Sequence, residues 1–160
     1  MFKVGDLAVY PAQGVGKIEA IEKKEVMGTQ QMFYIVRIIE SGMRIMIPVD
    51  SVDSVGLRTL ITTKEIPKVY AILKNRDISV DKQTWNKRYR EYLEKIKTGS
   101  VYEIARVLRD LLILKGDKNL SFGERKMVDI ARNLLVKEIS IASAEEESKV
   151  EDSIRKIFTS

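Results

Sequence analysis

The sequence predicts an α+β protein in which a small antiparallel β-barrel of the SH3 or Tudor kind precedes an all-α domain of about five helices. Three observations support this prediction. Residues 1–57 contain short apolar runs separated by turn residues. After Gly56 the runs lengthen and take a helical period, and several begin with a Ser/Thr-x-x-Glu motif. The charge divides as well, because residues 1–57 hold six basic and seven acidic side chains whereas residues 58–160 hold 22 and 16.

The predicted strands are runs of β-branched, aromatic and other apolar residues that lie between Gly- and Pro-containing turns. They cover residues 7–10, 18–26, 32–39 and 43–47. In the last run, the two-residue period of a strand places Met46 on the same face as the charged Arg44. That arrangement fits a docking face as well as it fits a half-buried methionine at a barrel corner, and the pattern leaves both interpretations open.

The predicted helices cover residues 64–74, 82–97, 101–115, 122–141 and 144–158. Their starts are predicted from capping boxes, in which a Ser or Thr is followed three residues later by Glu. Four pairs fit this motif: Thr62 with Glu65, Ser100 with Glu103, Ser121 with Glu124, and Ser143 with Glu146. Asp81 is the expected cap of the second helix, and Gly99 is its expected stop.

The only tryptophan, Trp85, lies in the most basic helical stretch of the chain. Residues 64–126 hold 16 basic and nine acidic side chains, a balance that suits either a polyanion partner or a solvated helical surface. A large aromatic side chain among cations could contact a nucleic-acid backbone and press against its bases. Helical spacing alone favours a core position instead, because the following residues continue one apolar stripe with Trp85: Tyr89, Tyr92, Leu93 and Ile96.

Composition argues against an enzyme and against a membrane protein. The chain contains no cysteine and no histidine, so disulfides, thiolate nucleophiles and the commonest general base and metal ligand are excluded. We therefore expect no metal and no cofactor. Gly14-Val15-Gly16-Lys17 lacks the residues that a phosphate-binding loop requires and is expected to be a strand turn. No apolar run is long enough for a signal peptide or a membrane span, so a soluble, cytoplasmic protein is expected.

Several segments together resemble the bacterial CarD/CdnL family of transcription regulators. The segments are Phe2-Lys3-Val4-Gly5-Asp6, Val9-Tyr10-Pro11, Gly14-Val15-Gly16, Met43-Arg44-Ile45-Met46-Ile47-Pro48, Trp85-Asn86-Lys87-Arg88-Tyr89-Arg90, Leu93-Glu94-Lys95-Ile96, Thr98-Gly99 and Leu120-Ser121-Phe122-Gly123-Glu124-Arg125-Lys126-Met127. The first segments also resemble the RNA-polymerase-interaction domain of transcription-repair coupling factors. The resemblance spans the whole chain and is closest to the short form of the family, which has no AT-hook tail.

For the first domain, residues 1–57, the resemblance implies docking on the β subunit of RNA polymerase. The strand that matches Arg44 to Pro48 contributes to that contact in the family, so Met46 and Pro48 are the expected interface residues. Lys24 and Arg44 are the expected flanking charges. Some relatives carry Arg where Met46 stands. Edge-strand pairing is a reasonable mode of contact for so small a barrel.

For the helical domain, residues 64–160, the resemblance implies contact with promoter DNA at the upstream edge of the transcription bubble. The residue that matches Trp85 packs against the minor groove, and Lys87, Arg88 and Arg90 match neighbouring backbone contacts. The expected function is therefore that of a non-catalytic, monomeric regulator that reaches the nucleoid through RNA polymerase, stabilises the open complex and binds free DNA weakly. The alternative is a polymerase-bound adaptor whose basic helical domain binds an acidic protein.

Overall fold

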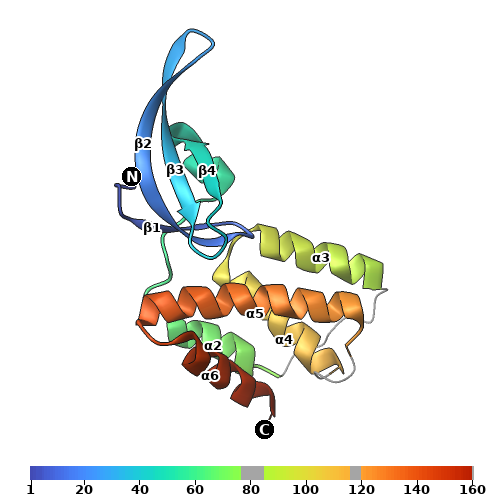
Figure 1. Ribbon diagram of the computed structural model, residues 1–160. Coiled ribbons are helices and arrows are strands. Elements are labelled where there is room, and N and C mark those ends of the chain that lie inside the picture. Colours follow the sequence, from blue (N-terminus) through green and yellow to red (C-terminus); the bar gives the residue numbers. More distant parts are fainter. Residues whose placement is uncertain (77–84, 116–119, 160) are drawn as a thin grey trace. The chain divides into compact units, whose positions relative to one another are not determined.

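The computed structural model describes residues 1–76, 85–115 and 120–159, which divide into two compact units, Met1–Leu60 and Ile61–Ser160 (Figure 1). The first unit contains all the described strands, and the second contains the longer helices. Among the described helices, none combines the length and the apolar character that a membrane span requires.

The first unit is built on a four-stranded antiparallel sheet, in which each strand pairs with the next one along the chain. The strands are β1 (Leu7–Tyr10), β2 (Gly14–Val26), β3 (Thr29–Ile38) and β4 (Arg44–Pro48). Figure 1 shows the strands curled, and the sheet stays open in the described residues because β1 and β4 each pair with only one other strand. The prediction of an antiparallel β-domain followed by helices is confirmed, with a curled half-barrel as the β-domain.

Two glycines explain how β2 and β3 pair so closely. The turn between them consists of Met27 and Gly28, whose φ values of 52° and 81° are those of a type I′ hairpin. The twist of such a turn matches the twist of the two strands. Further along β2, a Cβ atom on Gly16 would lie 2.6 Å from Cγ1 of Val36, so only glycine allows the strands to approach there.

The core of the first unit lies on one face of the sheet. It contains Ala8, Ile18, Tyr34, Val36, Ile38, Ile47 and Leu57. Two short helices follow β4, η1 (Val49–Ser51) and α1 (Val52–Val55), and their valines pack against this core. Gly56, with φ of 88°, ends α1 and returns the chain to the core at Leu57.

The second unit contains five helices among its described residues, as predicted. They are α2 (Ile66–Lys74), α3 (Trp85–Lys97), α4 (Val101–Lys115), α5 (Phe122–Ser143) and α6 (Glu147–Thr159). The predicted start of the second helix at residue 82, and its predicted cap Asp81, lie outside the described residues. Helix α4 contributes Ala105, Val107, Leu108 and Leu111, all fully buried, to a core that every one of the five helices joins.

The predicted capping boxes have different outcomes. Ser121 and Glu124 form a complete box at the start of α5, as predicted. The prediction for Ser143 is wrong, because α5 continues to that residue and its hydroxyl donates to the carbonyl of Ile139 within the same helix. Helix α5 buries side chains as far as Ser140 and ends at Ser143, past its predicted end at residue 141.

The predicted capping box of Thr62 and Glu65 does not form at the start of α2. The carboxylate of Glu65 accepts hydrogen bonds from the backbone N–H and the hydroxyl of Thr62, at 3.2 and 3.0 Å. However, α2 begins only at Ile66, so Glu65 is the N-cap residue and not the third residue of the helix. The contact therefore closes a turn that leads into α2 and does not cap its first N–H groups.

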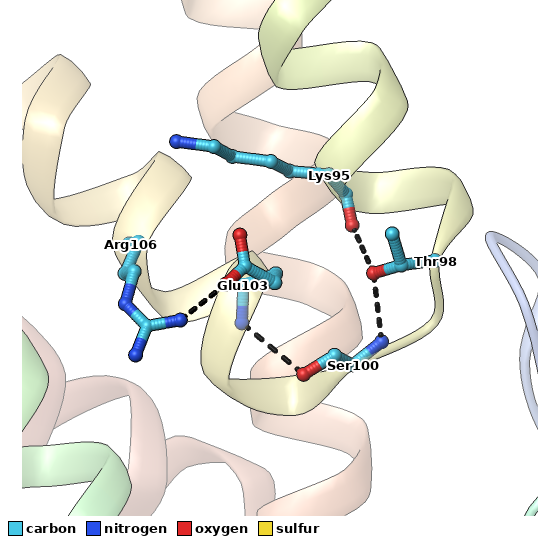
Figure 2. Close-up of polar contacts among 5 residues, drawn as sticks. All are labelled: Lys95, Thr98, Ser100, Glu103 and Arg106. Atoms are coloured by element: carbon cyan, nitrogen blue, oxygen red, sulfur yellow. Dashed lines mark hydrogen bonds and ion pairs between the residues drawn. The ribbon is translucent and has the colours of Figure 1, made fainter.

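A network of polar contacts fixes the turn between α3 and α4 (Figure 2). The hydroxyl of Thr98 donates to the carbonyl of Lys95 at 2.6 Å and accepts from the N–H of Ser100 at 3.2 Å. Ser100 in turn accepts from the N–H of Glu103 at 3.4 Å, which is half of the predicted capping box. Glu103 pairs with Arg106 instead of returning to Ser100, whose N–H is already bonded to Thr98.

Candidate functional site

The first candidate site lies on the face of the sheet opposite the core. Along β4, Ile45 and Ile47 turn towards the core, whereas Arg44 and Met46 turn outwards, as the two-residue period predicts. Met46, for which the pattern left a docking face and a half-buried corner position open, is 44% exposed beside the charged Arg44. Pro48, the third residue of this series, is half-buried at the end of the strand.

The strand register extends this face across the sheet. Residues that lie opposite each other in neighbouring strands carry their side chains on the same face. Met46 lies opposite Ile35, which lies opposite Ala20, and Pro48 lies opposite Phe33. These five residues, Ala20, Phe33, Ile35, Met46 and Pro48, lie in two adjacent cross-strand rows, and we call them the outer apolar strip. Met46 is exposed and Ala20, Ile35 and Pro48 are half-buried, whereas Phe33 is only 8% exposed.

Charged side chains flank the outer apolar strip. On one side, the carboxylate of Glu19 bridges two guanidinium groups, at 3.0 Å from Nε of Arg44 and 3.4 Å from Nε of Arg37. On the other side, Nζ of Lys24 lies 3.7 Å from a carboxylate oxygen of Glu22. The two predicted flanking charges, Lys24 and Arg44, are therefore separated by the strip. An apolar centre with a polar rim is the usual composition of a protein–protein interface.

The backbone of β4 adds hydrogen-bonding groups at the edge of the sheet. The N–H of Ile38 donates to the carbonyl of Met43 at 2.8 Å. This bond shows which residues of β4 direct their N–H and C=O groups towards β3. Because hydrogen-bonding direction alternates along an antiparallel strand, the N–H and C=O groups of Arg44 and Met46 point away from β3. Pro48 offers only its carbonyl there. In the described part of the chain, no strand pairs with this edge.

The second candidate site is the first half of α3. Trp85 is the first residue of this helix. Its side chain is outside the described part of the structure, so the alternatives of a core position and a DNA-facing position are not tested. Lys87 and Arg90 are exposed, as their predicted role requires. Three positions apart on a helix, they lie near each other on its surface.

Arg88 differs from these two cations. Its side chain is only 8% exposed, and its guanidinium lies 3.6 Å from the carboxylate of Glu124 on α5. It also hydrogen-bonds Tyr92, whose pKa is raised mainly by burial and further by the Asp110 carboxylate. The expected phosphate contact at this position differs from those at Lys87 and Arg90, because the Arg88 guanidinium is buried against a carboxylate and presents little surface to DNA in this structure.

The predicted apolar stripe of α3 is partly displaced. Tyr92 and Ile96 are buried as predicted and Leu93 is half-buried, but Tyr89 is 41% exposed. Arg88 lies one turn before Tyr92 and takes a place in the buried face. A periodic spacing of apolar side chains does not indicate that a charged residue occupies a buried position between them.

One exposed side chain near this site was missed in the sequence. Phe122, the first residue of α5, is 85% exposed. Figure 1 shows the first turns of α3 and α5 at the same end of the helical unit, where Arg88 joins Glu124. The helical period could have indicated this exposure, because Phe122 and Ala131 lie on opposite faces of α5 and Ala131 is fully buried. The exposed cations Arg125 and Lys126 follow it on the same turn.

The arrangement can bind partners, and its two surfaces differ in chemistry. The outer apolar strip suits a protein surface, whereas the exposed Phe122 of α5 and the exposed cations of the two helices, Lys87, Arg90, Arg125 and Lys126, suit a polyanion. Among the described residues, no group of acidic side chains is arranged to hold a metal ion.

Comparison with family models assigns the two parts of the chain separately. Residues 2–61 match the model described as the CarD-like/TRCF RID domain, and residues 68–155 match the model described as the CarD C-terminal domain. Together the two matches cover both units of the structure.

Individual proteins show the same similarity. The chain is 35% identical over 150 residues to a protein of Bacillus subtilis (strain 168) that bears the name "Putative transcription factor YdeB", with 94% of this chain and 97% of the relative covered. A structure described as CdnLNt from Myxococcus xanthus is 61% identical, covers 38% of this chain and 86% of its own, and has a TM-score of 0.33. The 72-residue N-terminal domain of Myxococcus xanthus CarD, solved by NMR, is 41% identical and covers 37% of this chain and 79% of its own, with the same TM-score.

Proposed function

This chain belongs to the CarD/CdnL family of transcription regulators, and from that premise we propose that it tethers itself to RNA polymerase and stabilises the promoter open complex. The sheet would provide the tether, and the helical unit would contact DNA at the upstream edge of the bubble. The observation that carries the proposal is the gathering of Lys24, Arg44, Met46 and Pro48 on one face and edge of the sheet.

The tether would combine two kinds of contact with the β subunit. The outer apolar strip would lose water against an apolar partner surface, and the edge of β4 would accept a strand in antiparallel or parallel pairing. The ion pairs of Glu19 with Arg37 and Arg44 hold two cations at one end of the strip. Such rim charges affect orientation and association rate more than affinity.

The DNA contact would be centred on Trp85, with Lys87 and Arg90 on neighbouring phosphates. A side chain that presses against an unstacked base step stabilises melted DNA more than duplex DNA. A contact of about 1.4 kcal/mol that is absent from the closing transition state would lengthen the life of the open complex about tenfold. Phosphate contacts are insensitive to sequence, so promoter choice would come from polymerase.

This role requires no chemistry, which agrees with a family of transcription-factor type. A single copy carries both contacts, so a monomer would suffice. The protein would act in the cytoplasm, at promoters that polymerase already occupies.

The experiment that tests the proposal measures the lifetime of the open complex at a ribosomal-RNA promoter. Wild-type protein should lengthen it. Met46→Asp should lose the effect at low protein concentration and regain it at high concentration, because only the tether is weakened. Trp85→Ala should bind polymerase and lose the effect at every concentration. If the wild-type protein binds polymerase without changing the lifetime, the proposal is wrong and an acidic protein partner becomes the better explanation.

A further inference from the structure

The chain passes from the first unit to the second between Leu57 and Ile61. Hydrogen bonds anchor the backbone on both sides of this joint, at Arg58 and at Ile61. On the first side, Leu57 is 5% exposed and belongs to the core of the sheet. Arg58 exchanges two backbone hydrogen bonds with Val9 of β1, at 2.7 and 3.2 Å. The chain is therefore part of the first unit as far as Arg58.

On the second side, the anchor is a buried carboxylate. Ile61 is 5% exposed in the core of the helical unit, and its N–H donates to Oε2 of Glu138 at 2.9 Å. Glu138 lies on α5, is 3% exposed, and is 77 positions away in the sequence. Its contact fixes the backbone at the point where the helical unit begins.

Only Thr59 and Leu60 remain between the two anchors. Three residue-to-residue steps join Arg58 to Ile61, so their Cα atoms can lie at most about 11 Å apart. The guanidinium of Arg58 also donates to the carbonyl of Thr59 at 3.0 Å, which restricts the backbone of Thr59. Changes in the direction of one unit relative to the other must therefore come from very few backbone dihedral angles.

Glu138 is an unexpected residue at a core position. Burying a carboxylate costs free energy unless strong hydrogen bonds offset the loss of water, and an apolar residue would fill the site without that cost. Anchoring the backbone N–H of Ile61 gives the carboxylate a specific structural task, since that N–H is itself buried and needs an acceptor.

We propose that Glu138 is a positioning residue that keeps the joint as short as Thr59 and Leu60. This proposal rests on the proposed function and adds a requirement to it. The effective concentration at which a unit held on polymerase delivers the other unit to DNA depends on the length and stiffness of the connection, so a longer or looser joint lowers it. Loosening the joint would weaken the DNA contact without altering a single residue that touches DNA or polymerase.

Three variants separate the joint from the fold. Glu138→Gln keeps an oxygen acceptor for Ile61, and Glu138→Leu removes it at similar volume. An insertion of Gly-Gly-Ser between Thr59 and Leu60 lengthens the joint and leaves both anchors in place. Val128→Ala creates a cavity elsewhere on α5, where Val128 is 1% exposed. This variant controls for loss of stability alone.

The first measurement is the distribution of distances between the two units in the full-length protein. Because the chain has no cysteine, spin labels can be placed through Met27→Cys and Glu151→Cys, both at exposed positions. The insertion and Glu138→Leu should broaden the distribution, whereas Glu138→Gln and Val128→Ala should keep the wild-type width. If Glu138→Leu does not fold, the insertion decides whether a short joint orders the units, and a broadened Glu138→Gln would count against the anchor. Wild-type widths in both loosened variants would overturn the proposal.

The second measurement is the lifetime of the open complex with the same variants. The insertion and Glu138→Leu should bind polymerase like wild type and lose the lengthening, and a higher concentration should not restore it. Glu138→Gln should retain the effect. Broad distances with a full effect on lifetime would overturn the positioning role. If wild type itself had no effect, the proposed function would fail, while the distance distributions would still decide whether the joint is fixed.

Discussion

The guanidinium of Arg88 on α3 lies 3.6 Å from the carboxylate of Glu124 in the first turn of α5, and both side chains are almost fully buried. Glu124 also completes the capping box of its helix by accepting from the N–H of Ser121. One carboxylate therefore caps α5 and joins it to α3. The pair places the exposed cations of α3 beside the first turn of α5, so it organises the proposed DNA surface without belonging to it.

The first prediction is that Arg88→Met destabilises the protein by about 3–5 kcal/mol, because it leaves a buried carboxylate without its cationic partner. Urea denaturation measures this loss. Arg90→Met, two positions away and exposed, should change stability by no more than about 0.5 kcal/mol. Combining Arg88→Met with Glu124→Gln removes both charges, keeps an acceptor for Ser121, and should recover part of the loss. Equal effects of the Arg88 and Arg90 substitutions would contradict the structural role of the pair.

The second prediction concerns the outer apolar strip. Met46→Asp should weaken binding to the polymerase β subunit tenfold or more, since an unpaired carboxylate at an apolar interface costs more than about 1.4 kcal/mol. Titration calorimetry measures the affinity, and thermal unfolding should show an intact fold because Met46 is 44% exposed. Met27→Asp is the matched control: Met27 is 99% exposed at the hairpin turn, away from the strip, and its substitution should leave affinity unchanged. Equal losses from both would place the contact elsewhere.

The third prediction addresses the cations of α3. Lys87→Ala together with Arg90→Ala should reduce the dependence of DNA contact on salt by about two counterions, because each phosphate contact releases close to one. The measurement is the affinity of the polymerase-bound protein for promoter DNA at several salt concentrations. Lys97→Ala, an exposed cation in the last turn of the same helix, should leave the slope unaltered. An unchanged slope in the double variant would remove these two residues from the DNA surface.

The fourth prediction is a pH effect at the start of α2. The pKa of Glu65 is lowered, first by a hydrogen bond from Tyr102 and then by hydrogen bonds from Thr62. A lowered pKa in the folded state means that ionised Glu65 contributes stability above its ordinary value of 4.5, and that the contribution is lost as pH falls through the lowered value. Tyr102→Phe should move the pKa back towards 4.5, which an NMR titration of the Glu65 carboxyl group would detect. A titration curve identical to wild type would show that Tyr102 does not stabilise the carboxylate.

Much of the fold could be predicted from the sequence, because its signals are local. The alternation along β4 and the turn at Gly28 follow from neighbouring residues, and the capping box at Ser121 follows from a spacing of three. The failures have a common cause. At Ser143 the same motif occurs within a helix, where burial of the preceding turn outweighs the local signal to begin a new one.

The candidate sites, like the fold, could be predicted only in part from the sequence. Residue type and strand period were enough to predict that Met46 and Arg44 share one face of the strand. They did not indicate that Ala20, Phe33 and Ile35 continue that face, because the register of three strands aligns these residues. Phe122 was missed for a related reason, since its exposure depends on which face of α5 the rest of the unit covers.

By itself, the sequence determined the division of the chain into a β part and a helical part, the location of positive charge, and the residues that favour turns and helix starts. These properties depend on side-chain chemistry and on neighbours within a few positions. Only the tertiary structure decided that Arg88 is buried while Arg90 is exposed, and that Glu138 holds the backbone at Ile61. The physical reason is that burial and ion pairing depend on partners distant in the sequence, here Glu124 for Arg88 and Ile61 for Glu138, which no local pattern identifies.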